Sequence, residues 1–318
     1  LGCSDKCYIM TECPQNPMMD LGLMNAGLEI GQAFELDSAA CKTYRANIGD
    51  HVQECDISQE LILEQESCHG MVFTYPCTKY STIADIHGTR TGDQLFLHAL
   101  RHLAVAKPEF YIVENVVGMK AFPIVMEAMS RLPDYYVQVF CPIKSELWLP
   151  QRRDRLFIVG TKSPFPIRPP ANTRPIKLSD ILEENPDVTL PKAIKARMNG
   201  EYRDLPIISD PERGDIAPTC VAHYAKDNST RLVKDKRFPM GVRPYSVREW
   251  ARLQGLPDTF KFPVSDTEAY KQVGNGVSVK AAEWVGAEMV RYMNKFTNAA
   301  KTITTPKKPL ISAQMSLI

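Results

Sequence analysis

Short apolar runs alternate with helical patterns over the first half of the chain. Residues 92–107 and 122–132 place apolar side chains at helical spacing. Four other runs have strand length and are rich in β-branched and aromatic residues. These are residues 70–75 (GMVFTY), 109–116 (EFYIVENV), 135–143 (YYVQVFCPI) and 155–161 (RLFIVGT). The alternation of strands and helices predicts an α/β fold with a mostly parallel sheet and helices on both faces.

The pattern changes after Gly160. Residues 163–177 contain five prolines and predict an irregular linker, and the chain then stays polar and turn-rich to about residue 240. Ser246 and Glu249 form a capping box that should open a helix, and residues 278–295 read as a long amphipathic helix. We therefore predict four parts: a first domain over residues 1–162, a small irregular domain over 163–260, a helical return to the first domain over 261–296, and a flexible tail over 297–318.

Composition narrows the class of protein. Of the 318 residues, 44% are hydrophobic and 24% are charged, which is typical of a soluble globular protein. No apolar run approaches the roughly 20 residues that a membrane span needs, and no secretory signal opens the chain. Nine cysteines in a chain without a signal favour free thiols and a cytoplasmic location. Cys3, Cys7 and Cys13 lie close together but fit no metal-site spacing, so we predict no metal.

Charge gives a weaker indication. The net charge of +1 excludes a globally basic nucleic-acid binder. Locally, residues 151–177 carry seven Lys or Arg against one acid, and residues 226–243 carry six against two. Basic runs are usually solvated faces, so these stretches favour nucleic acid only weakly by themselves.

Two reactive side chains fall where predicted strands end. Cys77 follows the apolar run that begins at Gly70, and Glu114 ends the run FYIVE. A free cysteine is often only a small hydrophobic residue. In parallel sheets, however, ligands bind beyond the carboxyl ends of the strands, so this pair of side chains predicts a site.

Five motifs then occur in an order that resembles the cytosine-C5 DNA methyltransferase family, over residues 19 to 295. They are Pro76-Cys77, Glu114-Asn115-Val116, Gln151-Arg152-Arg153-Asp154-Arg155, RPYSVREWARLQGLPDTF, and Gly274-Asn275-Gly276-Val277. The resemblance implies a Rossmann-like class I methyltransferase fold with a small target-recognition domain, S-adenosylmethionine as cofactor, and a cytosine flipped out of double-stranded DNA. It further implies a prokaryotic or phage enzyme of restriction–modification type, monomeric, with a restriction endonuclease that acts separately.

The resemblance also assigns catalytic roles. Carbon 5 of cytosine is a poor nucleophile, and a thiolate that adds to carbon 6 activates it; the family's nucleophile matches Cys77. Glu114 matches the acid that contacts N3, where a raised pKa would suit the shared proton. Arg153 and Arg155 match the arginines that hold the cytosine carbonyl and stabilise the catalytic loop.

Cofactor contacts are implied in the same way. Glu35 matches the acid that binds the ribose hydroxyls, with Asp37 as the alternative, because a carboxylate accepts two hydrogen bonds from a vicinal diol. Leu95 matches an apolar contact, although a core role is equally open. The remaining matches are Asp56 and Ile57 at the adenine, and Pro76, Asn275 and Val277.

One family feature is missing from the sequence. The family opens with a strand followed by F-x-G-x-G-G, whose glycines let the backbone approach the cofactor. Residues 1–17 contain no such loop and no clear strand, so residues 1–18 read as a degenerate first motif. A second hypothesis therefore stays open, that of a relative that binds DNA without methylating it. A third is a tRNA-directed enzyme, since one branch of the family methylates tRNA.

Overall fold

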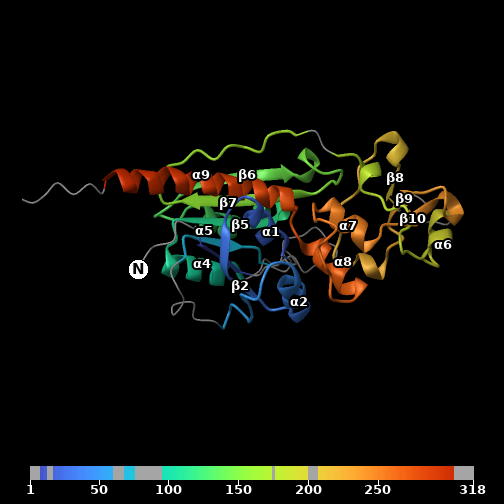
Figure 1. Ribbon diagram of the computed structural model, residues 1–318, viewed down its shortest axis with the longest axis horizontal. Coiled ribbons are helices and arrows are strands. Elements are labelled where there is room, and N and C mark those ends of the chain that lie inside the picture. Colours follow the sequence, from blue (N-terminus) through green and yellow to red (C-terminus); the bar gives the residue numbers. More distant parts are fainter. Residues whose placement is uncertain are drawn as a thin grey trace, which may run out of the picture.

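A seven-stranded sheet forms the centre of the protein (Figure 1). The computed structural model describes residues 8–12, 17–59, 68–75, 95–173, 176–199 and 207–303. Its strands are β1 (Tyr8–Glu12), β2 (Glu29–Glu35), β3 (Val52–Glu54), β4 (Gly70–Phe73), β5 (Phe110–Val116), β6 (Tyr136–Lys144) and β7 (Asp154–Thr161), in the order β3-β2-β1-β4-β5-β7-β6. Every neighbouring pair is parallel except the two that β7 makes. The predicted α/β fold with a mostly parallel sheet is confirmed.

Strand β1 corrects the sequence analysis, which found no clear strand before residue 18. It lies between β2 and β4 and pairs with both in parallel. Ile9 and Met10 are buried in opposite apolar clusters, and the backbone between them carries an irregularity in register. Three consecutive apolar residues are too few to reveal a period, which explains why the pattern missed a strand at the centre of the sheet.

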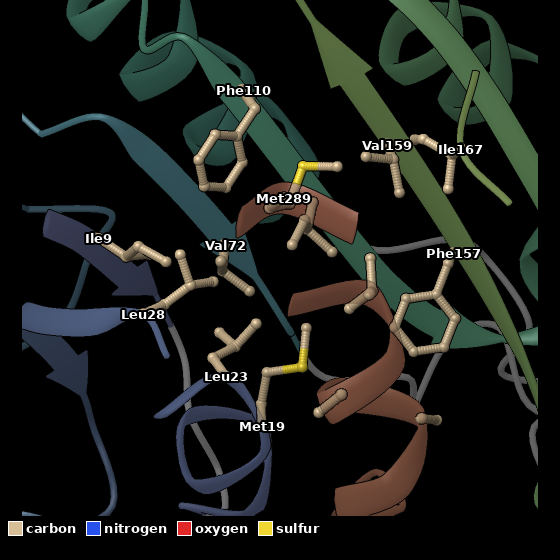
Figure 2. Packing of buried hydrophobic residues seen from close by; sticks show 14 of the residues in the cluster. Ile9, Met19, Leu23, Leu28, Val72, Phe110, Phe157, Val159, Ile167 and Met289 are labelled. Carbon is tan, nitrogen blue, oxygen red and sulfur yellow. The ribbon is translucent and has the colours of Figure 1, made fainter. Parts of the chain in front are cut away.

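Helices cover both faces of the sheet. On one face α1 (Met18–Asn25) and α9 (Val279–Ile303) pack over the strands, and Figure 2 shows Leu23 and Met289 of these helices around Val72 of β4. On the other face Met71 and Phe73 pack against α4 (Leu95–Ala106) and α5 (Pro123–Ser130). Successive residues of a strand point to opposite faces, so β4 is apolar throughout because both faces are covered.

Helix α9 packs closely on α1 through Gly22. A Cβ atom at that position would lie 2.5 Å from Ala282 Cβ and 2.6 Å from Val279 O. The helix continues to Ile303, seven residues into the stretch expected to be a flexible tail. That stretch contains Ala299 and Ala300, which have high helix propensity and favour continuation. No helix in the described ranges combines the length and apolar character needed to cross a membrane.

A second, three-stranded sheet lies at one end of the molecule (Figure 1). Its order is β10-β9-β8, with β8 parallel and β10 antiparallel to β9. Arg243 of β10 is fully buried and pairs with Glu249 of α7 at 2.7 Å, and α7 begins with the predicted capping box. Strands of three or four residues carry no readable period, so the sequence suggested irregular structure here. The bounds are β8 (Ile207–Ser209), β9 (Arg231–Lys234), β10 (Val242–Pro244) and α7 (Val247–Leu253).

The remaining helices connect or flank these two sheets. They are α2 (Ser38–Asn47), α6 (Ile194–Asn199) and α8 (Asp266–Asn275), with short 3-10 helices η2 (Val117–Ala121), η3 (Ser145–Leu147), η4 (Leu178–Asp180), η5 (Pro211–Arg213), η6 (Tyr224–Lys226) and η7 (Pro239–Gly241). One apolar cluster joins α7, α8 and the start of α9 with Leu178 and Tyr224, so the chain around the small sheet shares a core with the helices that return to the large sheet.

Candidate active site

A cavity of about 380 Å³ opens where β2 and β3 end. Four separate stretches of the chain meet around it: the residues after β2, those after β3, the start of α4, and the last turn of α8. Its lining consists of Glu35, Leu36, Asp37, Cys55, Asp56, Ile57, Leu95, Lys271, Gln272 and Asn275. The carboxyl edge of a parallel sheet is where a ligand is expected, and five of the seven residues that the sequence matched to a cofactor line this cavity.

Glu35 is the buried acid of this cavity. It is the last residue of β2 and is only 4% exposed. Its Oε1 accepts a hydrogen bond from the backbone N–H of Asp37 at 2.7 Å, whereas its Oε2 is buried and has no hydrogen-bond partner among the described residues. Burial raises the pKa of Glu35 to about 7. A buried acceptor without a partner is costly, and a ligand that brings hydroxyl donors would satisfy it.

Asp37, the alternative acid, is already used by the protein. Its Oδ1 caps α2 by accepting from the N–H groups of Ala39 at 2.9 Å and Ala40 at 3.2 Å. Its Oδ2 accepts from Lys271 Nζ at 2.6 Å. Burial by itself would raise the pKa of Asp37. The Lys271 ammonium and the N–H groups of α2 outweigh burial, so the pKa of Asp37 is lowered. The geometry therefore favours Glu35 over Asp37 for a diol.

The other matched cofactor residues divide into three groups. Asp56, Ile57, Leu95 and Asn275 line the cavity. Val277 does not: it is 3% exposed and lies in the apolar cluster between the sheet and α9. Pro76 lies outside the described residues, as does Cys77. The sequence analysis missed Leu36, Cys55, Lys271 and Gln272, although Lys271 and Gln272 lie within three residues of the matched Gly-Asn-Gly-Val motif.

Glu114 and Arg155 form a buried pair at the same edge of the large sheet. Strands β5 and β7 are antiparallel neighbours, and their register pairs Val116 with Arg155. Glu114 is 7% exposed, and its Oε1 lies 2.9 Å from Arg155 Nε. Burial raises the pKa of Glu114, while the guanidinium groups of Arg155 and Arg153 oppose that rise. A buried carboxyl held by one arginine is suited to sharing a proton with a ligand.

The residues that follow β4 lie next to the end of β5, close to Glu114. Strand β4 pairs with β5 up to Phe73 and Val113. Two residues later, the backbone carbonyl of Tyr75 accepts a hydrogen bond from Asn115 Nδ2 at 3.2 Å. Tyr75 is the last described residue before Pro76 and Cys77, so the described chain leads toward the matched nucleophile from beside Glu114.

Arg153 occupies a different environment from Arg155. Its side chain is 1% exposed and donates to three backbone carbonyls. Nη1 reaches Cys220 O at 3.0 Å, and Nη2 reaches Gly274 O at 2.7 Å as well as Gly276 O. The structure therefore brings Glu114 and Arg155 together but directs the guanidinium of Arg153 to the end of α8 and to the chain around Cys220.

Most cations of the stretch 226–243 already have partners inside the protein. Arg243 is fully buried, whereas the exposed Lys236 pairs with Glu212 at 2.7 Å and remains accessible. Some of the acids that pair with these cations, such as Asp210 and Glu249, lie outside the stretch and are not visible in its composition. The stretch therefore offers fewer cations to a nucleic acid than its composition suggests. The contacts are Lys234–Asp210, Lys236–Glu212, Arg237–Asp235, Arg243–Asp235, Arg243–Glu249 and Arg231 to the Thr219 carbonyl.

Comparison with known proteins gives a consistent result. A family described as C-5 cytosine-specific DNA methylase matches residues 18–291. The chain is 29% identical over 289 residues to the Type II methyltransferase M1.ScrFI of Lactococcus lactis subsp. cremoris, which covers 82% of this chain and 72% of that protein. It is 30% identical over 291 residues to the Type II methyltransferase M.SsoII of Shigella sonnei, with 80% and 72% covered.

Solved structures share the fold at lower identity. The S. pombe Dnmt2 methyltransferase superposes with a TM-score of 0.74 and 18% identity over 91% of this chain and 99% of that one. The Entamoeba histolytica methyltransferase EhMeth gives 0.72 and 17% over 92% and 99%. These two likenesses establish the Rossmann-like architecture.

Proposed function

Because the chain belongs to the C-5 cytosine-specific DNA methylase family, we propose that it transfers a methyl group from S-adenosylmethionine to carbon 5 of a cytosine in duplex DNA. The observation that carries this proposal is the buried Glu114 carboxyl, held by Arg155 at 2.9 Å where the chain leaves β4 toward Cys77. A base inside a duplex cannot reach such a site, so the target cytosine has to be flipped out of the stack.

The residues around the cavity fit the cofactor. Glu35 would accept the ribose hydroxyls at its unpartnered Oε2, and Ile57 and Leu95 would pack against the adenine ring. Asp56 and Asn275 offer further polar groups on the same lining. When bound, S-adenosylmethionine supplies an electrophilic methyl group on its sulfonium.

The chain's own groups would perform the remaining chemistry. The Cys77 thiolate forms a bond to carbon 6 of the ring, and the electron pair of the C5–C6 double bond moves into the ring toward N3. Glu114 shares its proton with N3 and so limits the negative charge there. Arg155 orients the Glu114 carboxyl and stabilises it electrostatically. Carbon 5 is then nucleophilic and takes the methyl group as the carbon–sulfur bond of the sulfonium breaks, with S-adenosylhomocysteine as the leaving group. Loss of the carbon 5 proton to a base and expulsion of the Cys77 thiolate then restore the C5–C6 double bond.

A transfer assay tests this function. The intact protein should transfer labelled methyl groups to DNA, and it should form a covalent adduct with DNA that contains 5-fluorocytosine, because the fluorine cannot leave as a proton does. Cys77→Ala should lose both signals and still bind DNA. A covalent adduct in that variant would show that the nucleophile lies elsewhere, and absence of transfer by the wild type would refute the proposed activity.

A second candidate function is DNA binding without methyl transfer. The sequence between β1 and α1 reads CPQNP and contains no glycine, whereas close approach of the backbone to a cofactor favours glycine. Titration calorimetry with S-adenosylhomocysteine separates the two functions. Binding at micromolar concentration favours the methyltransferase, and failure to bind favours the second candidate.

A further inference from the structure

The short stretch from Pro150 to Arg153 is fastened to residues 217–222, which we call the 217–222 segment. The N–H of Arg152 donates to Ala217 O at 2.8 Å, and the N–H of Ala217 donates to Pro150 O at 2.8 Å. The Thr219 hydroxyl donates to Arg152 O. These bonds connect the 217–222 segment to the large sheet at the point where β7 begins.

The 217–222 segment is also hydrogen-bonded by side chains of the small sheet. Arg231 of β9 donates from Nε to Thr219 O at 2.9 Å, and Ser209 of β8 donates to Ile216 O at 3.1 Å, one residue before the segment. Cys220 and Tyr224 lie in the apolar cluster that α7 and α8 share. A displacement of the small sheet would therefore reach the segment directly.

Helix α8 lies between this segment and the cofactor cavity. On one side it presents Lys271, Gln272 and Asn275 to the cavity. On the other side Gly274 meets the segment so closely that a Cβ atom there would overlap the backbone of Val221 and Ala222. The two surfaces of α8 are thus formed by the same last stretch of the helix, and only glycine at position 274 permits the contact with the segment.

Arg153 joins all three parts. One guanidinium nitrogen, Nη1, binds Cys220 O in the segment, and the other, Nη2, binds Gly274 O and Gly276 O on either side of Asn275. The planar fork of arginine has donors in fixed directions, so it sets the distance between these carbonyls in a way that a flexible lysine cannot.

We infer that Arg153 is a positioning residue that couples the cofactor cavity to the small sheet. Filling the cavity orders the end of α8, and Arg153 transmits that order to the 217–222 segment. This inference rests on the proposed function, because it takes S-adenosylmethionine or its product as the occupant. Linkage requires the converse effect, so a nucleic acid that orders the small sheet tightens cofactor binding by the same factor.

Hydrogen exchange of the intact protein, with and without S-adenosylhomocysteine, tests the coupling. In the wild type, amides of residues 271–276 should gain protection on binding, and those of the 217–222 segment should slow by at least about threefold. In Arg153→Met the gain should remain at residues 271–276 and disappear from the segment. Arg153→Lys should give an intermediate gain.

Arg152→Met is the matched control. It removes the neighbouring arginine, which is largely exposed and lies 3.8 Å from Glu146, and it should show the wild-type protection of the segment. A wild type protected at residues 271–276 but not in the segment would overturn the coupling, even if the Arg153 variants do not fold. Equal protection of the segment in Arg153→Met and wild type would overturn it as well. If residues 271–276 gain no protection, the proposed function fails and the coupling fails with it.

Discussion

Cofactor affinity should depend on the protonation of Glu35. Burial raises the pKa of this carboxyl to about 7, and its unpartnered Oε2 is the acceptor offered to the ribose. Protonation removes one acceptor from the carboxyl, so the ionised form should bind far better. Asp37, whose pKa is lowered, and Lys271, whose pKa is raised, keep their charges throughout the neutral range, which leaves Glu35 as the group of this trio that titrates there.

The magnitude follows from the ionised fraction. With a pKa of about 7, roughly nine tenths of Glu35 is ionised at pH 8 and roughly one tenth at pH 6, so the apparent Kd should rise about tenfold between them. A carboxyl with an ordinary glutamate pKa is almost fully ionised at both values and would give essentially no change. The two cases are easily separated by experiment.

The assay is titration calorimetry with S-adenosylhomocysteine from pH 6 to pH 8. Glu35→Gln should bind more weakly at pH 8 and lose the pH dependence, apart from any contribution of the ligand itself. Asp56→Asn is the control, because Asp56 lines the same cavity but its pKa is lowered, through hydrogen bonds from Ser58, and it should keep the tenfold slope. A flat wild-type profile, or the same slope in Glu35→Gln, would refute the reasoning.

Three further predictions concern single side chains. Glu114→Gln should lower turnover by about 10² to 10⁴ and change DNA affinity less than twofold, as measured by methyl transfer and filter binding; unchanged turnover would remove Glu114 from the mechanism. Asp20, which accepts from Tyr44, has its pKa raised by burial to about 6, so its contribution to the free energy of unfolding should fall by about 2 kcal/mol as pH rises from 4 to 6. Urea unfolding of Asp20→Asn should lack that step, and an equal step in both proteins would contradict it. Gly22→Ala should cost about 1–3 kcal/mol, because its methyl group would meet Ala282 at 2.5 Å, and an unchanged Tm would show that α9 yields freely.

The sequence predicted the fold wherever apolar runs were long enough to show a period. Strands β4, β5 and β7 are largely buried and β6 carries a long run of apolar residues, so all four were found, whereas β1 offers only three consecutive apolar residues and was missed. The register of the small sheet could not be read from strands of three or four residues. Helix α9 ends at Ile303, beyond the predicted end at residue 295, because the end of a helix depends on weak local propensities.

The candidate site divides along a similar physical line. Glu35, Asp56 and Asn275 could be assigned to the cofactor cavity because each belongs to a sequence motif that is recognisable in this chain. Lys271 could not, since its partner Asp37 lies 234 residues away and the pair exists only after folding. Arg153 was matched by motif, but its partners are backbone carbonyls, which have no signature in any sequence.

Glu35 and Glu114 are both buried acids with raised pKa values, yet the proposed reaction asks opposite things of them. Cofactor binding needs Glu35 without its proton, whereas activation of the ring needs Glu114 to share one. The bound ribose would stabilise the Glu35 carboxylate, so the requirement at Glu35 should appear in kcat/KM for the cofactor below about pH 7 and vanish from kcat at saturation. The requirement at Glu114 should instead appear in kcat as a decline on the alkaline side, because ionised Glu114 paired with Arg155 has no proton to share. The contrary result would be a kcat at saturating cofactor that falls below pH 7 in the wild type but not in Glu35→Gln. It would show that the bound ribose does not keep Glu35 ionised, and that the cofactor does not bind Glu35 as proposed for this cavity.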